Sequence, residues 1–81
     1  MKATNKNKNI VITFSEEEAL VFFGWLSNFN QEERSTLFQD QAEERILFDI
    51  EAELETVVSA TFDNNYQEIL LKARQKIRDV E

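Results

Sequence analysis

The sequence contains no cysteine, no histidine and no proline, and only one glycine among its 81 residues. Without histidine, the chain lacks the commonest general base and the commonest metal ligand. Without cysteine, it can form neither a disulfide nor a thiolate nucleophile. A single glycine excludes the usual glycine-rich phosphate loops. These absences predict a protein that is not an enzyme and that binds no cofactor.

Long apolar runs are also missing. No stretch approaches the roughly 20 apolar residues of a membrane span. The basic, polar N-terminus, MKATNKNKN, is not followed by the apolar core of a signal peptide. The lack of cysteine fits a reducing compartment. We therefore expect a cytoplasmic protein without membrane association, and the length leaves room for one domain.

The net charge of −7 is unevenly distributed along the chain. Residues 1–14 carry three lysines and no acid, whereas residues 15–63 carry thirteen acids and two arginines. A direct nucleic-acid binder usually has a basic patch on its folded part, so we expect no direct nucleic-acid binding. The acidity is interpreted as solubility and helix-terminal preference, with a surface for a basic protein partner as the alternative.

Residues 9–14, NIVITF, predict a β-strand because β-branched residues and phenylalanine dominate them. Side chains alternate along a strand, which places Ile10, Ile12 and Phe14 on one face, and we expect this to be the core face. Residues 1–8 are predicted to be a flexible basic arm, and residues 9–81 a single helical domain.

Three helix starts are marked by a capping residue followed three positions later by glutamate. They are Ser15 with Glu18, Asp40 with Glu43, and Asn65 with Glu68. Apolar periodicity predicts helices over residues 15–29, 40–58 and 65 to near the end, and a loop with one helical turn over 30–39. The predicted fold class is mainly α, a three-helix domain preceded by one short N-terminal β-strand.

The apolar stripes of these helices predict the core. Phe62 is expected beneath the connection between the second and third helices. The other residues expected to face inward are Ala19, Phe22, Phe23, Trp25, Leu26, Phe29, Ala42, Ile46, Leu47, Ile50, Leu54, Val57, Val58, Tyr66, Ile69, Leu70, Ala73, Ile77 and Val80.

Three segments, EEEALVFFGWL, AEERILFDIEAELE and FDNNYQEILLKAR, together resemble a family of small bacterial proteins without an assigned function. The resemblance covers most of residues 10–78. It rests on patterns of apolar and charged residues, and the chain departs from the family pattern at Gly24, where a helix former is expected. The resemblance implies a bacterial domain and supplies no active site.

The segment DIEAELE holds the densest group of acids, at positions 49, 51, 53 and 55. On a helix these acids point in several directions, so that Glu51 and Glu55 share one side and Asp49 and Glu53 another. Neither pair forms the cage of a loop-type metal site. A carboxylate metal-dependent enzyme is therefore the least favoured hypothesis, and a solvated helix face is the favoured interpretation.

Phe48 departs from the apolar pattern of its helix. It lies on a stripe with Glu44, Glu51 and Glu55, spaced at i, i+4, i+7 and i+11. An aromatic side chain with an acidic rim can anchor an interface. The alternative, left open by the sequence, is that the strand, the 30–39 loop or a neighbouring helix covers it.

Gly24 should cost a helix about 1 kcal/mol relative to alanine, which suggests a close approach at this position. The favoured interpretation is a central first helix that touches the other two helices and the strand, and the alternative is a helix–helix contact in a dimer. The surrounding FFGW is interpreted as core rather than as a stacking platform.

The backbone of the strand must find hydrogen-bond partners. Residues 56–62 could pair with it, or residues 9–14 could be a solvated extended arm, but we favour pairing with a second copy across a two-fold axis. The sequence thus predicts a homodimer and a non-enzymatic protein-interaction module. An acidic inhibitor or nucleic-acid mimic is the alternative. The predicted partner-binding residues are Ile10, Val11, Ile12, Thr13, Glu44, Phe48, Glu51 and Glu55.

Overall fold

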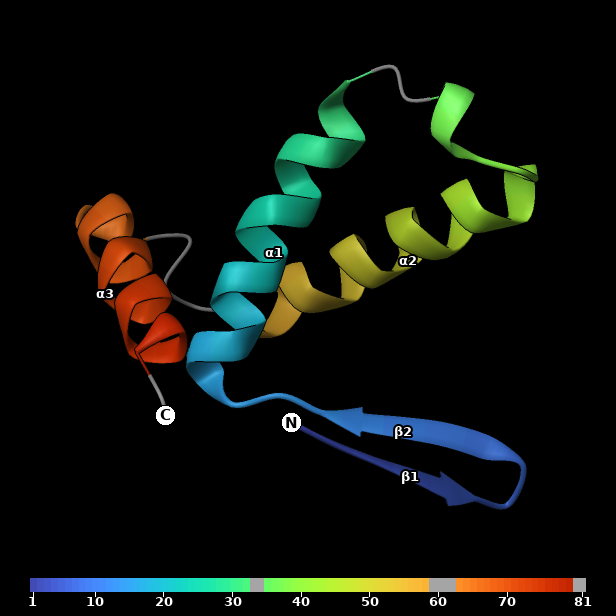
Figure 1. Ribbon diagram of the computed structural model, residues 1–81, viewed down its shortest axis with the longest axis horizontal. Coiled ribbons are helices and arrows are strands. Elements are labelled where there is room, and N and C mark those ends of the chain that lie inside the picture. Colours follow the sequence, from blue (N-terminus) through green and yellow to red (C-terminus); the bar gives the residue numbers. More distant parts are fainter. Residues whose placement is uncertain (33–34, 59–62, 80–81) are drawn as a thin grey trace.

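A computed structural model describes residues 1–32, 35–58 and 63–79. A hairpin of strands β1 (Lys2–Lys6) and β2 (Asn9–Thr13) precedes helix α1 (Glu16–Gln31). A short 3-10 turn, η1 (Ser35–Leu37), then leads to helices α2 (Gln41–Val57) and α3 (Tyr66–Arg78) (Figure 1). The predicted class, three helices preceded by short β structure, is confirmed, and η1 is the helical turn expected within residues 30–39.

The first eight residues do not form the predicted flexible arm. Residues 2–6 are a strand that pairs antiparallel with β2, in a register that runs from Lys2 opposite Thr13 to Lys6 opposite Asn9. The partner of the predicted strand therefore lies in its own chain, and the prediction that another chain supplies it is wrong. The alternative partner, residues 56–62, is also wrong for Thr56 and Val57, which belong to α2, while residues 59–62 lie outside the described residues.

The hairpin closes through a two-residue loop, Asn7 and Lys8, whose φ angles are 52° and 69°. Positive φ at both central residues is the geometry of a type I′ turn, which matches the twist of the flanking strands. Asparagine adopts this conformation readily, whereas lysine is uncommon there. The turn was hard to recognise from the sequence because glycine usually follows the asparagine.

The start of α1 is fixed by a complete capping box. Ser15 Oγ accepts a hydrogen bond from the Glu18 N–H at 3.1 Å, and the Glu18 carboxylate accepts one from the Ser15 N–H at 2.8 Å. The Met1 ammonium lies 3.1 Å from Glu18 Oε1. These contacts lower the pKa of Glu18, the Ser15 N–H more than the ammonium. One side chain thus joins the helix start to the base of the hairpin.

The other two predicted helix starts are capped differently. Asp40 accepts from the Ala42 N–H at 2.8 Å, but Glu43 reaches back to the Gln39 N–H rather than to Asp40 itself. Asn65 makes no side-chain cap bond. The positions of the helix starts are confirmed, and a complete box forms only at Ser15.

Helix α1 is the centre of the helical part. Within the described residues, extensive packing between elements is confined to β1 with β2 and to α1 with α2 and with α3. Figure 1 shows α3 on one side of α1 and α2 on the other. Among the residues that the structure describes, the buried side chains are Leu20, Phe23, Leu26, Val58, Leu70 and Ala73.

Gly24 lies where α1 meets α3. A Cβ added at Gly24 would be 3.3 Å from the Tyr66 hydroxyl oxygen and 3.4 Å from Leu70 Cδ2. The close approach inferred from this glycine is confirmed, and it is made by α3 of the same chain rather than by α1 of a second copy. Packing of α1 on both other helices is likewise confirmed, whereas the predicted packing of the strand on α1 is not extensive within the described residues.

The arrangement is open for a chain of this size. It exposes 6749 Å², whereas a globular monomer of 9.5 kDa exposes about 5,000 Å². The radius of gyration is 14.2 Å, against about 12 Å for a compact chain of this length. Packing α2 and α3 on one helix, with the hairpin outside that packing, therefore leaves about 1,700 Å² more surface than a globular monomer would show.

Gly24→Ala should leave the free energy of unfolding unchanged or raise it by up to about 1 kcal/mol. The added helix propensity outweighs a small displacement of the Tyr66 side-chain tip. Gly24→Leu should lower it by about 1–3 kcal/mol, because the larger side chain collides with Leu70. Urea unfolding at one fixed protein concentration measures both, and a fully stable Gly24→Leu would contradict the α1–α3 contact.

Glu18→Gln should destabilise the protein at neutral pH. Because the folded pKa of Glu18 lies below its unfolded value, its charge stabilises the fold above the ordinary glutamate pKa, and this contribution disappears as the pH falls through the folded pKa. Urea unfolding across that acidic range should show the free energies of unfolding of the natural protein and of Glu18→Gln becoming equal as the pH falls. Glu16→Gln, in the same helical turn but outside the capping box, is the control, and an equal effect there would refute the role of the box.

Candidate interaction surface

The predicted partner-binding residues of β2 lie on an exposed ribbon. Both strands are exposed along their whole length. Ile10 is 66% and Ile12 is 53% exposed, so the prediction that they face the core is wrong. The alternation of the strand was read correctly, but no element of the chain covers the face on which these two residues lie within the described ranges.

The hairpin is two-faced. Ile10 is opposite Asn5 and Ile12 is opposite Ala3, and these four share one face. We call Ala3, Ile10 and Ile12 the hairpin face. The other face carries Val11, Thr13 and the two strand lysines, Lys2 and Lys6. The ribbon is thus apolar on one side and cationic on the other.

A row of stacked rings continues from the hairpin along α1. Ring centroids are 5.7 Å apart between Phe14 and Phe22, 6.4 Å between Phe22 and Trp25, and 5.0 Å between Trp25 and Phe29. Phe38 packs edge-on to Phe29 at 6.0 Å. These five rings, the aromatic row, follow favourable pair geometries. They connect the end of β2 with the segment that precedes α2.

The aromatic row is only partly covered. Trp25 is 53% exposed, and Phe14, Phe22 and Phe29 are partly exposed. The prediction that FFGW is core holds for Phe23 and Gly24 and is wrong for Trp25. Leu20, which is not among the residues expected to face inward, is buried instead. The face of α1 that packs on α2 and α3 is therefore rotated from the predicted one.

Helix α2 buries none of its seventeen residues. Ile46, Ile50, Glu53 and Val57 follow one another at i, i+4, i+7 and i+11 and form a line that we call the α2 stripe. Ile46 is 57% and Val57 is 73% exposed, although both were expected to face inward. Val58, the residue after the helix, is buried in the core, and Leu54 of α2 packs against that core.

The predicted stripe around Phe48 is present, but one of its side chains, Glu51, is hydrogen-bonded within the chain. Phe48 is exposed, as are Glu44 and Glu55. The Glu51 carboxylate instead accepts a hydrogen bond from Asn30 Nδ2 at 2.7 Å, and the same amide donates to the Leu47 carbonyl at 3.4 Å. Glu51 is thus turned toward α1, where it helps to attach α2.

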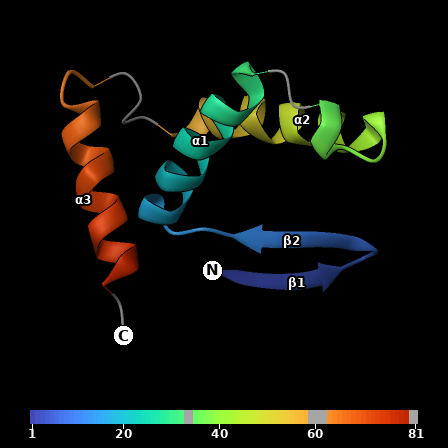
Figure 2. The same ribbon diagram turned by 45° about the horizontal axis from the view of Figure 1, so that its top comes forward.

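The hairpin and α2, the two exposed elements, carry opposite charges. The hairpin segment, residues 1–14, has Lys2, Lys6 and Lys8 and no acid. Helix α2 has six acids and one base, Arg45, which pairs with Asp49 at 3.2 Å. Two views place the hairpin and α2 on the same side of α1, opposite to α3 (Figure 2). A basic and an acidic surface, each with exposed apolar side chains, therefore extend from one molecule in the same general direction.

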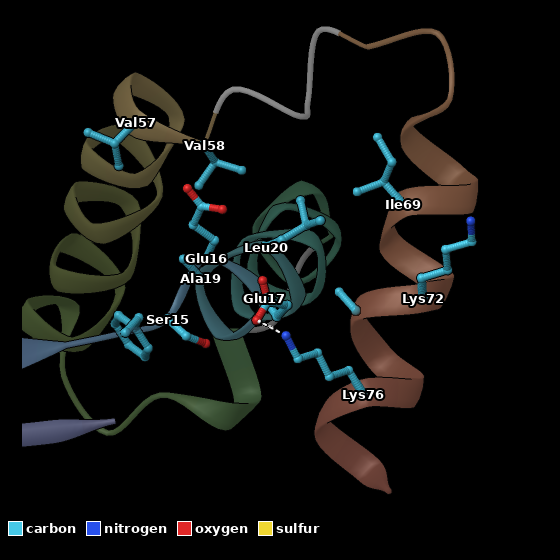
Figure 3. Close-up of a pocket in the computed structure, with 12 residues that line it drawn as sticks. Ser15, Glu16, Glu17, Ala19, Leu20, Val57, Val58, Ile69, Lys72 and Lys76 are labelled. Atoms are coloured by element: carbon cyan, nitrogen blue, oxygen red, sulfur yellow. Dashed lines mark ion pairs between the residues drawn. The ribbon is translucent and has the colours of Figure 1, made fainter. Parts of the chain in front are cut away.

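A hollow of about 520 Å³ lies between the start of α1, the end of α2 and α3 (Figure 3). Leu20, Val58, Ile69 and Ala73 line its apolar wall, while Lys76 pairs with Glu17 at 3.0 Å across its rim. The Ser15 hydroxyl at its edge already accepts the capping bond from Glu18. The hollow offers no activated nucleophile among these residues, and we assign it no chemistry.

The carboxylates of DIEAELE do not converge. Asp49 pairs with Arg45 and Glu51 accepts from Asn30, so two of the four acids already have partners within the chain. In the described part of the chain, no group of three or more potential ligands is close enough to hold a metal ion. In the same residues, no helix has the length and apolar content that crossing a membrane requires.

Comparisons with known proteins add no relative. No family model, curated protein or solved structure matches the chain. The resemblance to a family of small bacterial proteins therefore stays a prediction.

Proposed function

We propose that the protein is a non-enzymatic interaction module that self-associates and works as a homodimer. The bacterial cytoplasm is its proposed setting, on the basis of the sequence alone. The observation that carries the proposal is the uncovered apolar surface. The hairpin face is exposed, and the aromatic row and the α2 stripe are exposed at Trp25, Ile46 and Val57, in a chain that shows about 1,700 Å² more surface than a globular monomer.

The size of that surplus supports a stable dimer. Interfaces of standard size bury about 800 Å² on each partner, and obligate homodimers bury more. The surplus of one chain therefore exceeds what a standard contact needs. Because an 81-residue chain without disulfides has little core of its own, burial against a second copy would also raise its stability.

The hairpin gives a second reason. A two-stranded ribbon alone is marginally stable in water and needs a further strand or a helix against one face. Here it is attached to α1 near its base, through the Met1 ammonium on Glu18 and the ring of Phe14 on Phe22. A surface that covers Ile10 and Ile12 would supply what the ribbon lacks.

An acidic mimic of nucleic acid is the weaker proposal. It would present Glu44, Glu51 and Glu55 to a basic partner, yet Glu51 is hydrogen-bonded to Asn30. The exposed side chains that need explanation are chiefly apolar. Ionic strength separates the two proposals, because the affinity of a mimic falls steeply with salt whereas an apolar interface depends on it less.

Light scattering coupled to size exclusion should give about twice the 9.5 kDa mass of one chain. Trp25, the only tryptophan, reports the same event, because its emission should shift to the red when dilution separates the copies and exposes it. Trp25→Ser should lower the association constant, since it removes a large apolar side chain from the contact.

The matched control is Leu71→Ser, which removes an exposed apolar side chain from α3 and should leave association unchanged. A mass of one chain at every concentration, together with emission from Trp25 that does not change on dilution, would refute self-association.

A further inference from the structure

We infer that the two copies exchange their hairpins, so that the hairpin face of each copy docks on the α2 stripe of the other. This inference rests on the proposed self-association and names the contact that produces it. The occupant of the uncovered α2 stripe is then a second copy of this chain, and each copy gives and receives one hairpin.

The first support is that both surfaces are uncovered in one copy. Ile10 and Ile12 on the hairpin and Ile46 and Val57 on α2 are all more than half exposed. Within the described ranges, the hairpin does not pack extensively on its own α2, although both extend to the same side of α1 (Figures 1 and 2). Each surface therefore lacks a cover that a second copy can provide.

The second support is charge complementarity. The hairpin segment is cationic throughout, with Lys2, Lys6 and Lys8. The α2 stripe contains Glu53 at its centre, Glu43 lies one turn before Ile46, and the whole helix is acidic. Docking the apolar face of the ribbon on this stripe leaves Lys2 and Lys6 on the far face of a narrow two-stranded ribbon, and their long side chains reach these carboxylates around its edges.

The same charges disfavour a dimer in which the hairpins of two copies pair strand to strand. Two hairpins side by side would bring six lysines together without any acid from residues 1–14. Lysine on an edge strand is also a common device against edge pairing. Lys2 and Lys6 lie on β1, whose outer edge is unpaired in the described structure. Docking the hairpin of one copy on α2 of the other brings opposite charges together instead.

The third support is that the exchange closes on itself. Because each copy carries both the hairpin face and the α2 stripe, a two-fold axis satisfies both pairs of surfaces at once. No third copy is needed, and neither the hairpin face nor the α2 stripe remains open. A dimer of about twice the mass of one chain is thus the expected end point rather than a growing fibre.

Cysteine cross-linking tests the contact directly, because the natural chain has no cysteine. Asn5→Cys places a thiol beside Ile10 on the hairpin, and Glu53→Cys places one in the α2 stripe. When the two single variants are mixed and oxidised, a mixed disulfide dimer should form in preference to either symmetric dimer. Asn5→Cys mixed with Gln75→Cys, an exposed position on α3, is the control and should cross-link only at background level.

Three other outcomes overturn the inference in distinguishable ways. A dimer by mass that cross-links mainly between two Asn5→Cys chains shows strand-to-strand pairing, and the proposed self-association survives. A dimer in which the mixed disulfide does not exceed the Gln75→Cys background places the interface elsewhere. A monomer by mass, in which the double variant Asn5→Cys/Glu53→Cys closes an internal disulfide, shows that the hairpin covers its own helix, and both proposals then fail.

Charge reversal tests the same hairpin-on-α2 contact without introducing cysteine. The triple variant Lys2→Glu/Lys6→Glu/Lys8→Glu should weaken the homodimer about a hundredfold, because the two-fold axis repeats the three lysines of ordinary pair strength in both hairpin contacts. Glu43→Lys/Glu53→Lys should weaken it as well, and mixing the two variants should restore association. Association of the mixture that is no stronger than that of either variant alone would contradict a hairpin-on-α2 contact.

Discussion

The packing of α1 is the constraint on which the rest of the structure depends. Gly24 lets α3 approach closely at Tyr66 and Leu70, and Asn30 attaches α2 through the Leu47 carbonyl and Glu51. A single helix can bury only the faces that its neighbours present to it. Since α2 and α3 lie on different sides of α1, the outward faces of α2 and of the aromatic row stay exposed.

This constraint explains why the chain exposes more surface than a globular monomer and where that surface lies. The hairpin begins where α1 begins and is held there by Glu18 and Phe14, so its position is set by the same helix. Its apolar face leads into the aromatic row, which ends beside the start of α2. The exposed apolar side chains therefore form a sequence of neighbouring surfaces rather than isolated positions, as expected of an interface.

Local signals in the sequence predicted local structure well, and they could not predict which faces are covered. Ser15 and Asp40 marked helix starts through short-range capping chemistry, and Gly24 indicated a close approach. The apolar periodicity of α2 was equally clear, but periodicity states only that a face avoids water, not which molecule covers it. For the same reason, Ile10 and Ile12 were assigned to a core. The partner strand was missed because KATNK lacks β-branched alternation and its turn has no glycine.

Amide hydrogen exchange of residues 9–14, measured at protein concentrations above and below the association midpoint, tests most directly whether a second copy covers the exposed surface. If the hairpin depends on a second copy, its amides will be protected in the concentrated sample and will exchange rapidly after dilution, because a lone two-stranded ribbon is marginal. Protection that is equally strong at the lowest concentration would show that one chain stabilises its own hairpin, and would contradict the account.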